Sequence, residues 1–157
     1  MRWLTVNSFL LMMLMLPGCH SVSPSFPSKQ ADASMALAVN YLNHHQYEMA
    51  KRYLQMSYQR MPHSPLLWDA LAYYEELTGN FALADQDYRY AIQLNSQLGA
   101  VHNNYGVFLC HRGAYNKARE QFLTALKQAG YENYKVAYKN LRACCQKIKN
   151  CHLVFAH

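Results

Sequence analysis

The chain has 157 residues, which is the size of one domain. Charged residues make up 15% of it and the formal net charge is +6, with lysines and arginines scattered except in KNLRACCQKIK near the end. A nucleic-acid or phosphate surface clusters its cations, so this dispersed charge favours solvated helix faces and excludes nucleic acid as the expected partner.

Residues 1–18 have the features of an export signal and are not expected to be part of the fold. Arg2 is followed by an apolar run from Trp3 to Leu16, which is shorter than the roughly 20 residues that span a bilayer. The run ends in LPGC, which resembles the bacterial lipobox. That motif implies cleavage after Gly18 and acylation of Cys19, with palmitate among the attached chains. The alternative is an ordinary signal peptide in which Cys19 is incidental.

Residues 19–30 are expected to form a flexible tether between a lipid anchor and a folded body. The segment HSVSPSFPSKQ is rich in serine and proline and lacks helical periodicity. An Asp directly after a lipidated cysteine would favour retention in the inner membrane. His20 stands there instead, which is compatible with sorting to the outer membrane.

Residues 31–148 repeat with a period of 34 residues. The period is clearest in the small residues Ala38, Ala72 and Gly106. Five further positions keep the same step: His45, Gly79 and Gly113; Tyr47, Phe81 and Tyr115; Ala50, Ala84 and Ala118; Leu54, Tyr88 and Phe122; and Ser57, Ala91 and Ala125. This period and these residue types are those of the tetratricopeptide repeat.

The repeat predicts an all-α solenoid of about three helical hairpins, each made of a helix A and a helix B. The expected helices cover residues 31–44, 47–60, 65–78, 81–94, 99–112, 115–128 and 133–148. The last helix has no partner, so it is either a capping helix or a fourth repeat cut short. Residues 149–157 are left as a C-terminal tail.

Each recurring position has an expected structural role. The small residues should lie where helices A and B of one repeat cross closely, and the aromatic and bulky residues of helix B should fill the space between repeats. Gly79 and Gly113 suit a turn that needs positive φ. Ser64 followed by Pro65 fits the N-cap and first turn of a helix.

Two further motifs are NYGVFLC at residues 104–110 and AYKNLRAC at residues 137–144. They resemble motifs of the tetratricopeptide lipoproteins of type IV pilus biogenesis and stability, which are the pilotins of the pilus secretin. Members of that family typically carry an NYG-x-FLC helix and, in the next repeat, an AxxNxGxC helix. This chain has the first motif from Asn104 to Cys110. It has the second in Ala137, Asn140 and Cys144, with Arg142 where the family prefers glycine.

The resemblance implies a lipid-anchored protein on the periplasmic face of the outer membrane. Such a protein would bind secretin subunits and help them to assemble, as a scaffold without catalysis, cofactor or small-molecule substrate. Family members usually continue for further repeats, whereas CQKIKNCHLVFAH does not continue the pattern. The alternative is a periplasmic repeat adaptor of another envelope assembly complex.

Four cysteines remain if Cys19 is acylated. Cys110 and Cys144 lie toward the ends of successive A helices, which stack side by side in this architecture. Export would permit a disulfide between them, and the alternative is two free buried cysteines that pack as small hydrophobes. Cys145 and Cys151 receive no role from the sequence.

A partner would be expected on the concave face, which the A helices line. Its mixture of aromatic, amide and acidic groups suits an extended peptide or strand, and it lacks the basic cluster of a carboxylate clamp. Some of the apolar members could instead be packed between helices. The expected partner-binding residues are Met35, Val39, Leu42, Asp69, Tyr73, Glu76, Asn103 and Val107, with Cys110 at the margin.

Neither an enzyme nor a metal site is expected. Cys110 and His111 are adjacent on a helix and point to different faces, so they cannot act as nucleophile and base together. The spacing in CCQKIKNCH does not match common zinc sites, and His44 and His45 belong to a hairpin turn. No phosphate loop, paired-carboxylate pattern or HExxH motif occurs.

Overall fold

The computed structural model describes residues 28–147 and residue 151, and it contains seven α-helices in that part of the chain. The expected signal peptide, Cys19 and most of the tether and tail lie outside the described residues. The helices are α1 (Ser28–Asn43), α2 (Tyr47–Arg60), α3 (Pro65–Leu77), α4 (Phe81–Leu94), α5 (Gly99–His111), α6 (Tyr115–Lys127) and α7 (Tyr134–Cys145). These bounds confirm the helices expected from the period, although α1 begins at Ser28 rather than at residue 31.

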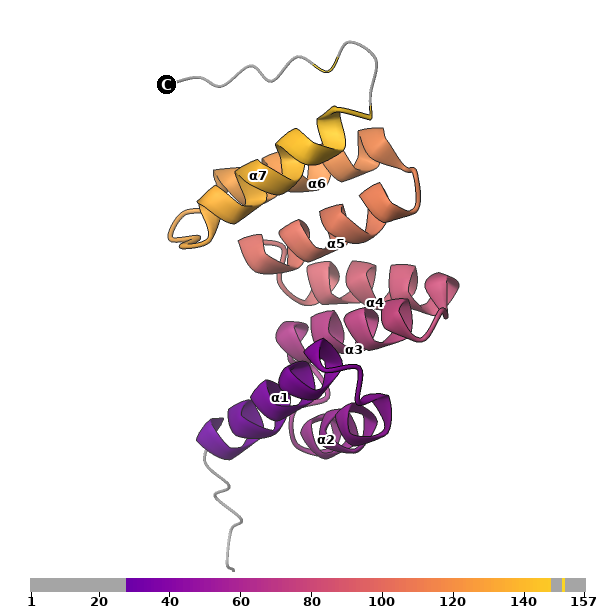
Figure 1. Ribbon diagram of the computed structural model, residues 1–157. Coiled ribbons are helices and arrows are strands. Elements are labelled where there is room, and N and C mark those ends of the chain that lie inside the picture. The colour runs from indigo at the N-terminus through magenta and orange to yellow at the C-terminus, as the bar shows by residue number, and fades with distance from the viewer. Residues whose placement is uncertain (1–27, 148–150, 152–157) are drawn as a thin grey trace, which may run out of the picture.

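The helices form three successive hairpins, α1–α2, α3–α4 and α5–α6, with α7 packed on the last of them (Figure 1). The stack runs from α1 at one end to α7 at the other, and each helix contacts mainly its neighbours in the stack. The A helices α1, α3, α5 and α7 also contact one another in series. The fold is therefore the all-α tetratricopeptide solenoid that the sequence predicts.

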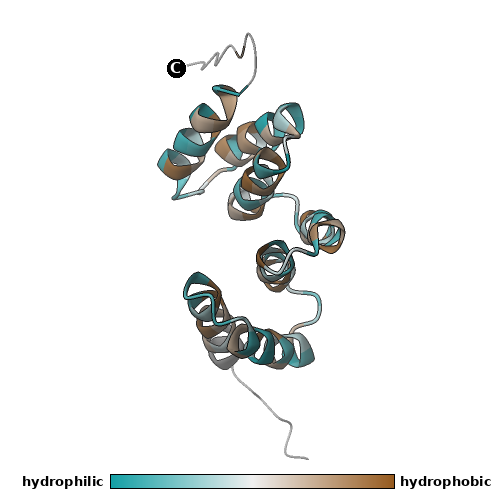
Figure 2. Ribbon diagram, turned by 45° about the vertical axis from the view of Figure 1, so that its right-hand side comes forward, coloured by the Kyte–Doolittle hydropathy of each residue, from teal (hydrophilic) through white to brown (hydrophobic). Residues whose placement is uncertain are grey.

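The recurring small and bulky positions form the core. Ala38, Ala72 and the six small residues of the B helices, which are Ala50, Ala84, Ala118, Ser57, Ala91 and Ala125, are fully buried. The bulky residues Leu54, Tyr88 and Phe122 are buried at the same level of each hairpin. The helices carry both hydrophobic and hydrophilic residues (Figure 2), because each buries one face against its neighbours.

The aromatic residues that begin the B helices are an exception to the expected packing. Tyr47 and Tyr115 are half-buried, while Phe81 is 39% exposed. The Phe81 ring is covered on one side by the Arg112 guanidinium, 4.0 Å from the ring centroid. These rings therefore do not fill closed spaces between repeats as the bulky residues seven positions later do.

The turn within each hairpin uses the left-handed backbone conformation. Gly79 has φ of 88° and Gly113 has φ of 75°, and His45 adopts the same conformation at φ of 56°. Helices commonly end in such a residue, which is usually glycine. The start of α3 is also as expected, since Ser64 accepts a hydrogen bond from the Leu67 backbone N–H and Pro65 follows in the first turn.

The buried hydrophobic residues fall into two clusters. The larger one joins α3 to α7 and contains Tyr88, Tyr105, Phe108 and Phe122. The smaller one joins α1, α2 and the start of α3, through Ala38, Leu54, Leu67 and Ala70. None of the described helices is both long and apolar enough to cross a membrane.

The last helix covers the end of the solenoid. Its inner face buries Ala137, Leu141, Cys144 and Cys145 against the preceding hairpin. Its other residues include exposed aromatic and aliphatic side chains, with Tyr134 the most accessible at 53%. This is the arrangement of a terminal A helix that stands without a B helix in the described part of the chain.

A candidate partner-binding groove

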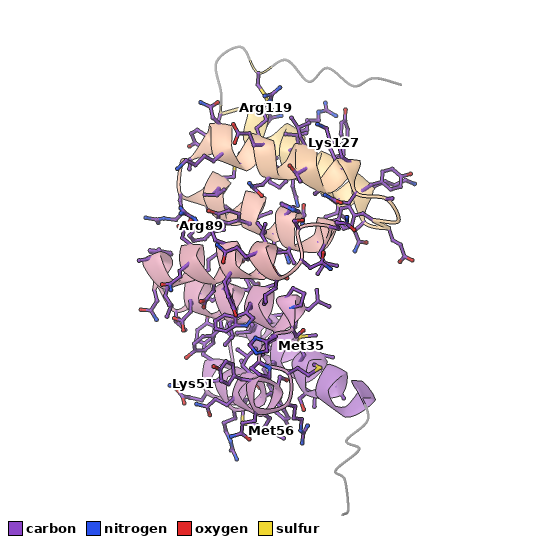
Figure 3. The ribbon with its side chains drawn as sticks, turned by 180° about the vertical axis from the view of Figure 1, so that it is seen from behind. Met35, Lys51, Met56, Arg89, Arg119 and Lys127 are labelled. Carbon is purple, nitrogen blue, oxygen red and sulfur yellow. A yellow bond between two sulfur atoms is a disulfide. The ribbon has the colours of Figure 1, made fainter. Side chains whose placement is uncertain are left out.

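A cavity of about 920 Å³ lies along the A helices. It receives side chains from α1, α3, α5 and α7, and Phe81 and Tyr88 contribute from α4. The opposite side of the molecule is formed by the B helices, where Lys51 and Met56 of α2, Arg89 of α4 and Lys127 of α6 project (Figure 3). The cavity is a groove that spans all the repeats on one face, and we call it the A-helix groove.

Seven of the eight residues expected to bind a partner meet around this groove: Met35, Val39, Asp69, Tyr73, Glu76, Asn103 and Val107. The period thus places residues of α1, α3 and α5 on one surface. Whether a partner binds there remains a prediction.

Leu42 does not belong to the groove. Its side chain is fully buried, and it lies one turn after Ala38, which is also fully buried. Residues four apart share a helix face, so Leu42 lies on the core side of α1. Cys110 lies at a separate small hollow, together with Val107 and Asn140.

The groove also contains residues that the sequence analysis did not assign to partner binding. Asn104, His111 and Arg112 contribute from α5 and the turn that follows it, and Val136 and Asn140 contribute from α7. The last two were missed because α7 was considered a cap or a shortened repeat. A signal was available in the period itself, since a fourth A helix stacks beside the third and extends the same face.

Three asparagines and one aspartate form a continuous hydrogen-bonded row in the groove, which we call the amide ladder. Asn140 Nδ2 donates to Asn103 Oδ1 at 3.1 Å, and Asn103 Nδ2 donates to Asn104 Oδ1 at 3.2 Å. Asn104 Nδ2 then donates to Asp69 Oδ2 at 2.8 Å. The ladder therefore joins α7, α5 and α3 across the groove.

Asp69 ends the ladder in an unusual state. Its Oδ2 accepts from Asn104, whereas its Oδ1 is buried and has no hydrogen-bond partner. Burial raises the pKa of this carboxyl to about 7, and the bond from Asn104 opposes that shift. At neutral pH the group therefore exists in both protonated and ionised forms.

A second acidic residue of the groove is fully partnered. Glu76 Oε1 lies 3.1 Å from His111 Nδ1, and Glu76 Oε2 accepts from the Tyr88 hydroxyl at 3.3 Å. Burial raises the pKa of Tyr88, and the nearby carboxylates of Asp69 and Glu76 raise it further. Tyr88 consequently remains a neutral donor.

Two disulfides fasten the end of the groove. Cys110 of α5 is joined to Cys144 of α7, with their Cα atoms 5.9 Å apart. Cys145 is joined to Cys151, with Cα atoms 5.5 Å apart. The second pair was missed by the sequence analysis, although the even number of cysteines left after Cys19 was a signal for it.

The chemistry available in the groove is that of binding. Within residues 28–147 and at residue 151, no three metal-ligating side chains are grouped as a metal site would require. Cys144, Cys145 and Cys151 are used in the disulfides. Amides, a carboxyl, aromatic rings and aliphatic side chains can together make hydrogen bonds and apolar contacts to a protein segment.

Comparison with known proteins gives two relatives by sequence. An uncharacterized protein of Haemophilus influenzae is 34% identical over 128 residues, which cover 80% of this chain and 72% of that protein. The type IV pilus assembly protein PilF of Pseudomonas aeruginosa is 30% identical over 147 residues, which cover 88% of this chain and 58% of PilF. No family model matches the chain.

Comparison with solved structures finds pilus proteins of the same fold. The structure of Pseudomonas aeruginosa PilF superposes with a TM-score of 0.71 at 29% identity, covering 76% of this chain and 54% of that one. The structure of PilW, a widely conserved type IV pilus biogenesis factor, superposes with a TM-score of 0.69 at 23% identity, covering 77% and 56%. The chain thus spans little more than half the length of the two pilus proteins.

Proposed function

The chain belongs to one family with the Haemophilus influenzae protein, and we propose that it is a type IV pilus biogenesis protein that binds secretin subunits and assists their assembly. The similarity to PilF supports the pilus role. The NYG-x-FLC and AxxNxGxC motifs support the pilotin assignment within it. The protein would act as a scaffold, with the A-helix groove as its binding site.

The observation that carries this proposal is the groove itself. An open cavity of about 920 Å³ that crosses four A helices is large enough for a segment of another protein. Its walls are largely aliphatic and aromatic, through Met35, Val39, Tyr73 and Val107. The amide ladder supplies polar groups inside these walls, which is the composition of a peptide-binding site.

We further propose that the protein is a lipoprotein of the outer membrane that faces the periplasm. The support is the LPGC motif, with Cys19 as the acylated residue, and His20 in the position after it. A lipid anchor at one end of the chain and a binding groove in the folded part would hold an exported secretin subunit beside the membrane into which it assembles.

Site-specific photo-crosslinking in the source bacterium tests the groove and the partner together. A photoreactive phenylalanine analogue at Tyr73, which lines the groove, should capture secretin subunits from envelope extracts. The matched control is the same analogue at Tyr58, a tyrosine of α2 that is 47% exposed outside the groove. Equal secretin capture from both positions, or capture of another envelope complex from Tyr73, would contradict the proposal.

A deletion strain tests the assembly role. Loss of the gene should deplete secretin multimers and surface pili, and the wild-type gene should restore both. Restoration by a Cys19→Ala variant should fail, and metabolic labelling with palmitate should mark the wild type but not this variant. Normal secretin multimers in the deletion strain would rule out the proposed role.

A further inference from the structure

The unpaired oxygen of Asp69 needs a physical explanation. Buried polar groups in proteins nearly always have a hydrogen-bond partner, and leaving a buried carboxylate oxygen without one is unfavourable. Asp69 Oδ1 is buried without a partner, and its residue lines the A-helix groove. Ser57 Oγ also lacks a partner but is enclosed in the core, whereas Asp69 belongs to the lining of the groove, where a ligand can supply the missing donor.

The amide ladder fixes what kind of partner that is. Every bond of the ladder donates in the direction of Asp69, from Asn140 to Asn103, from Asn103 to Asn104 and from Asn104 to Asp69. An amide side chain has two N–H groups, and these bonds use one from each asparagine. The ladder can therefore still donate from each asparagine, while its carboxyl end has an oxygen free to accept.

The other ionisable side chains in the groove each already have a contact within the chain. Glu76 is bonded to His111 and Tyr88, and Arg112 lies over the Phe81 ring. The surface around the ladder is aliphatic, through Met35, Val39, Val107 and Val136. A charged terminus would find no counter-charge cluster here, whereas an uncharged main chain would find both donors and an acceptor between apolar walls.

We propose that Asp69 and the amide ladder recognise the main chain of an extended, apolar and uncharged partner segment, with Asp69 Oδ1 accepting one of its N–H groups. The inference rests on the proposed function, because it assigns the chemistry of the segment that the groove binds. For a ligand N–H to reach the buried Oδ1, the carboxyl group must turn slightly about the Cβ–Cγ bond of Asp69, which is a soft torsion, and the Asn104 amide must follow Oδ2.

The Asp69→Asn variant distinguishes a ligand that donates a hydrogen bond to Asp69 from a ligand that accepts one from it. The asparagine oxygen can replace Oδ2 in accepting from Asn104, which leaves an NH₂ group where Oδ1 stood. An NH₂ group repels a ligand N–H but satisfies a ligand carbonyl. The variant should therefore lose binding if Asp69 accepts from the ligand, and keep it if a protonated Asp69 donates to the ligand.

The probe is a displayed library of peptides of about ten residues, which extend over roughly 33 Å, selected on the full-length chain in detergent. Peptides are kept if a Val107→Arg variant, which fills the groove, does not bind them. We expect selected sequences to be apolar and uncharged, and Asp69→Asn to raise their Kd by about tenfold or more, since bonds to charged groups contribute about 1.5–3 kcal/mol. The control Glu48→Gln removes an exposed carboxylate of α2 and should leave Kd unchanged.

N-methylation of the peptide, one residue at a time, tests main-chain recognition directly. At one position the methyl group should weaken binding to the wild type about tenfold and have little added effect on Asp69→Asn, because both changes remove the same bond. A merely structural role of Asp69 would give no such coupling. Asn104→Ala should also weaken binding, whereas Asn116→Ala, at an exposed amide of α6, should not.

Three results would overturn the inference: a library without groove-binding peptides, selected peptides that Asp69→Asn binds as well as the wild type, or an N-methyl scan without a coupled position. These are distinct from failure of the proposed function. Coupling without secretin crosslinks would retain main-chain recognition and reject the secretin as the partner. Secretin crosslinks at Tyr73 without coupling would retain the secretin as the partner and reject main-chain recognition by Asp69.

Discussion

Gly106 and Phe122 show how single residues set the distance between helices. A Cβ atom built at Gly106 would lie 2.8 Å from two atoms of the Phe122 ring, which is closer than side chains pack. In the first repeat the equivalent residues are Ala38 and Leu54, both buried. In the second repeat the equivalent pair is Ala72 with Tyr88, so an alanine is compatible with a ring there. At Gly106 the close position of the Phe122 ring leaves no room for a Cβ, and the cost of glycine to the helix, about 1 kcal/mol relative to alanine, is offset by close packing.

Gly106→Ala is expected to destabilise the protein by about 1–2 kcal/mol, because overpacking costs about 1–3 kcal/mol and exceeds the gain in helix propensity. Urea denaturation measures the loss. The double variant Gly106→Ala with Phe122→Leu should recover part of it, because it restores the pair found in the first repeat. A Gly106→Ala protein as stable as the wild type would show that the ring is free to move aside.

Two buried carboxyls should make stability depend on pH. Burial raises the pKa of Asp69 to about 7 and that of Asp87 to about 6, and Glu75 adds to the second shift. Unfolded aspartate titrates near ~3.9, so above that pH the folded chain holds protons that the unfolded chain has lost. The free energy of unfolding therefore falls as pH rises from about 4 to about 7.

We expect Asp69→Asn to unfold at a higher temperature than the wild type at pH 8, with a gain of at most about 4 kcal/mol, and at a similar temperature at pH 4. Calorimetry between pH 4 and pH 8 measures the unfolding temperatures of both proteins. Asp87→Asn should roughly halve the slope of stability against pH between about 4 and 6, where both carboxyls contribute, and leave unchanged the part between 6 and 7, which belongs to Asp69. A stability difference that is independent of pH would mean that Asp69 is ionised throughout.

At the scale of the elements, α7 depends on its attachment. It is the one A helix without a following B helix in the described part of the chain, and it buries one face against the preceding hairpin. The Cys110–Cys144 disulfide closes a separation of 34 residues and joins α7 to α5. Because Asn140 of α7 begins the amide ladder, this attachment also positions one end of the groove.

Replacing both Cys110 and Cys144 by serine should lower the free energy of unfolding by about 3–4 kcal/mol and increase hydrogen exchange in α7. Replacing Cys145 and Cys151 should cost less, about 2 kcal/mol in the same chain-entropy model, because that bridge closes a separation of 6 residues. Denaturation of the two oxidised variants gives the comparison. A larger loss from the second pair would contradict this order.

At the scale of the whole molecule, the solenoid has two unequal cores. The larger cluster extends from α3 to α7, and the smaller one holds α1 and α2 to the start of α3. In a stacked architecture each helix is stabilised mainly by its neighbours. The end with the smaller cluster and no disulfide among the described residues should therefore open first.

Hydrogen exchange should show α1 and α2 exchanging faster than α5 and α6. A groove-binding peptide should slow exchange in α1, since Met35 and Val39 line the groove, and this would couple binding to the order of the first repeat. Uniform exchange across the four helices would indicate a single cooperative unit. Protection confined to α7 would place the ligand at the α7 end of the groove, away from Met35 and Val39.

The period, the helices and the face on which the A helices form the groove could be predicted from the residue pattern, because each depends on contacts repeated at a fixed separation. The small residues, the bulky residues and the turn residues each recur at steps of 34, so that every repeat carries the same pattern. Seven groove residues followed from this register. Leu42 was assigned wrongly, because it lies one turn after Ala38 on the face of α1 that packs into the core.

The amide ladder and the second disulfide could not be predicted from the residue pattern and are seen only in the folded chain. Asn140 bonds to Asn103 across 37 residues and Asn104 to Asp69 across 35, separations that differ from the period. The connection from Lys127 to Tyr134 is longer than that from Leu94 to Gly99, so α7 is displaced from the register of the earlier A helices. This displacement affects the bond from Asn140 to Asn103, and every bond of the ladder depends on side-chain positions to within an ångström or so, which a pattern of residue types does not specify.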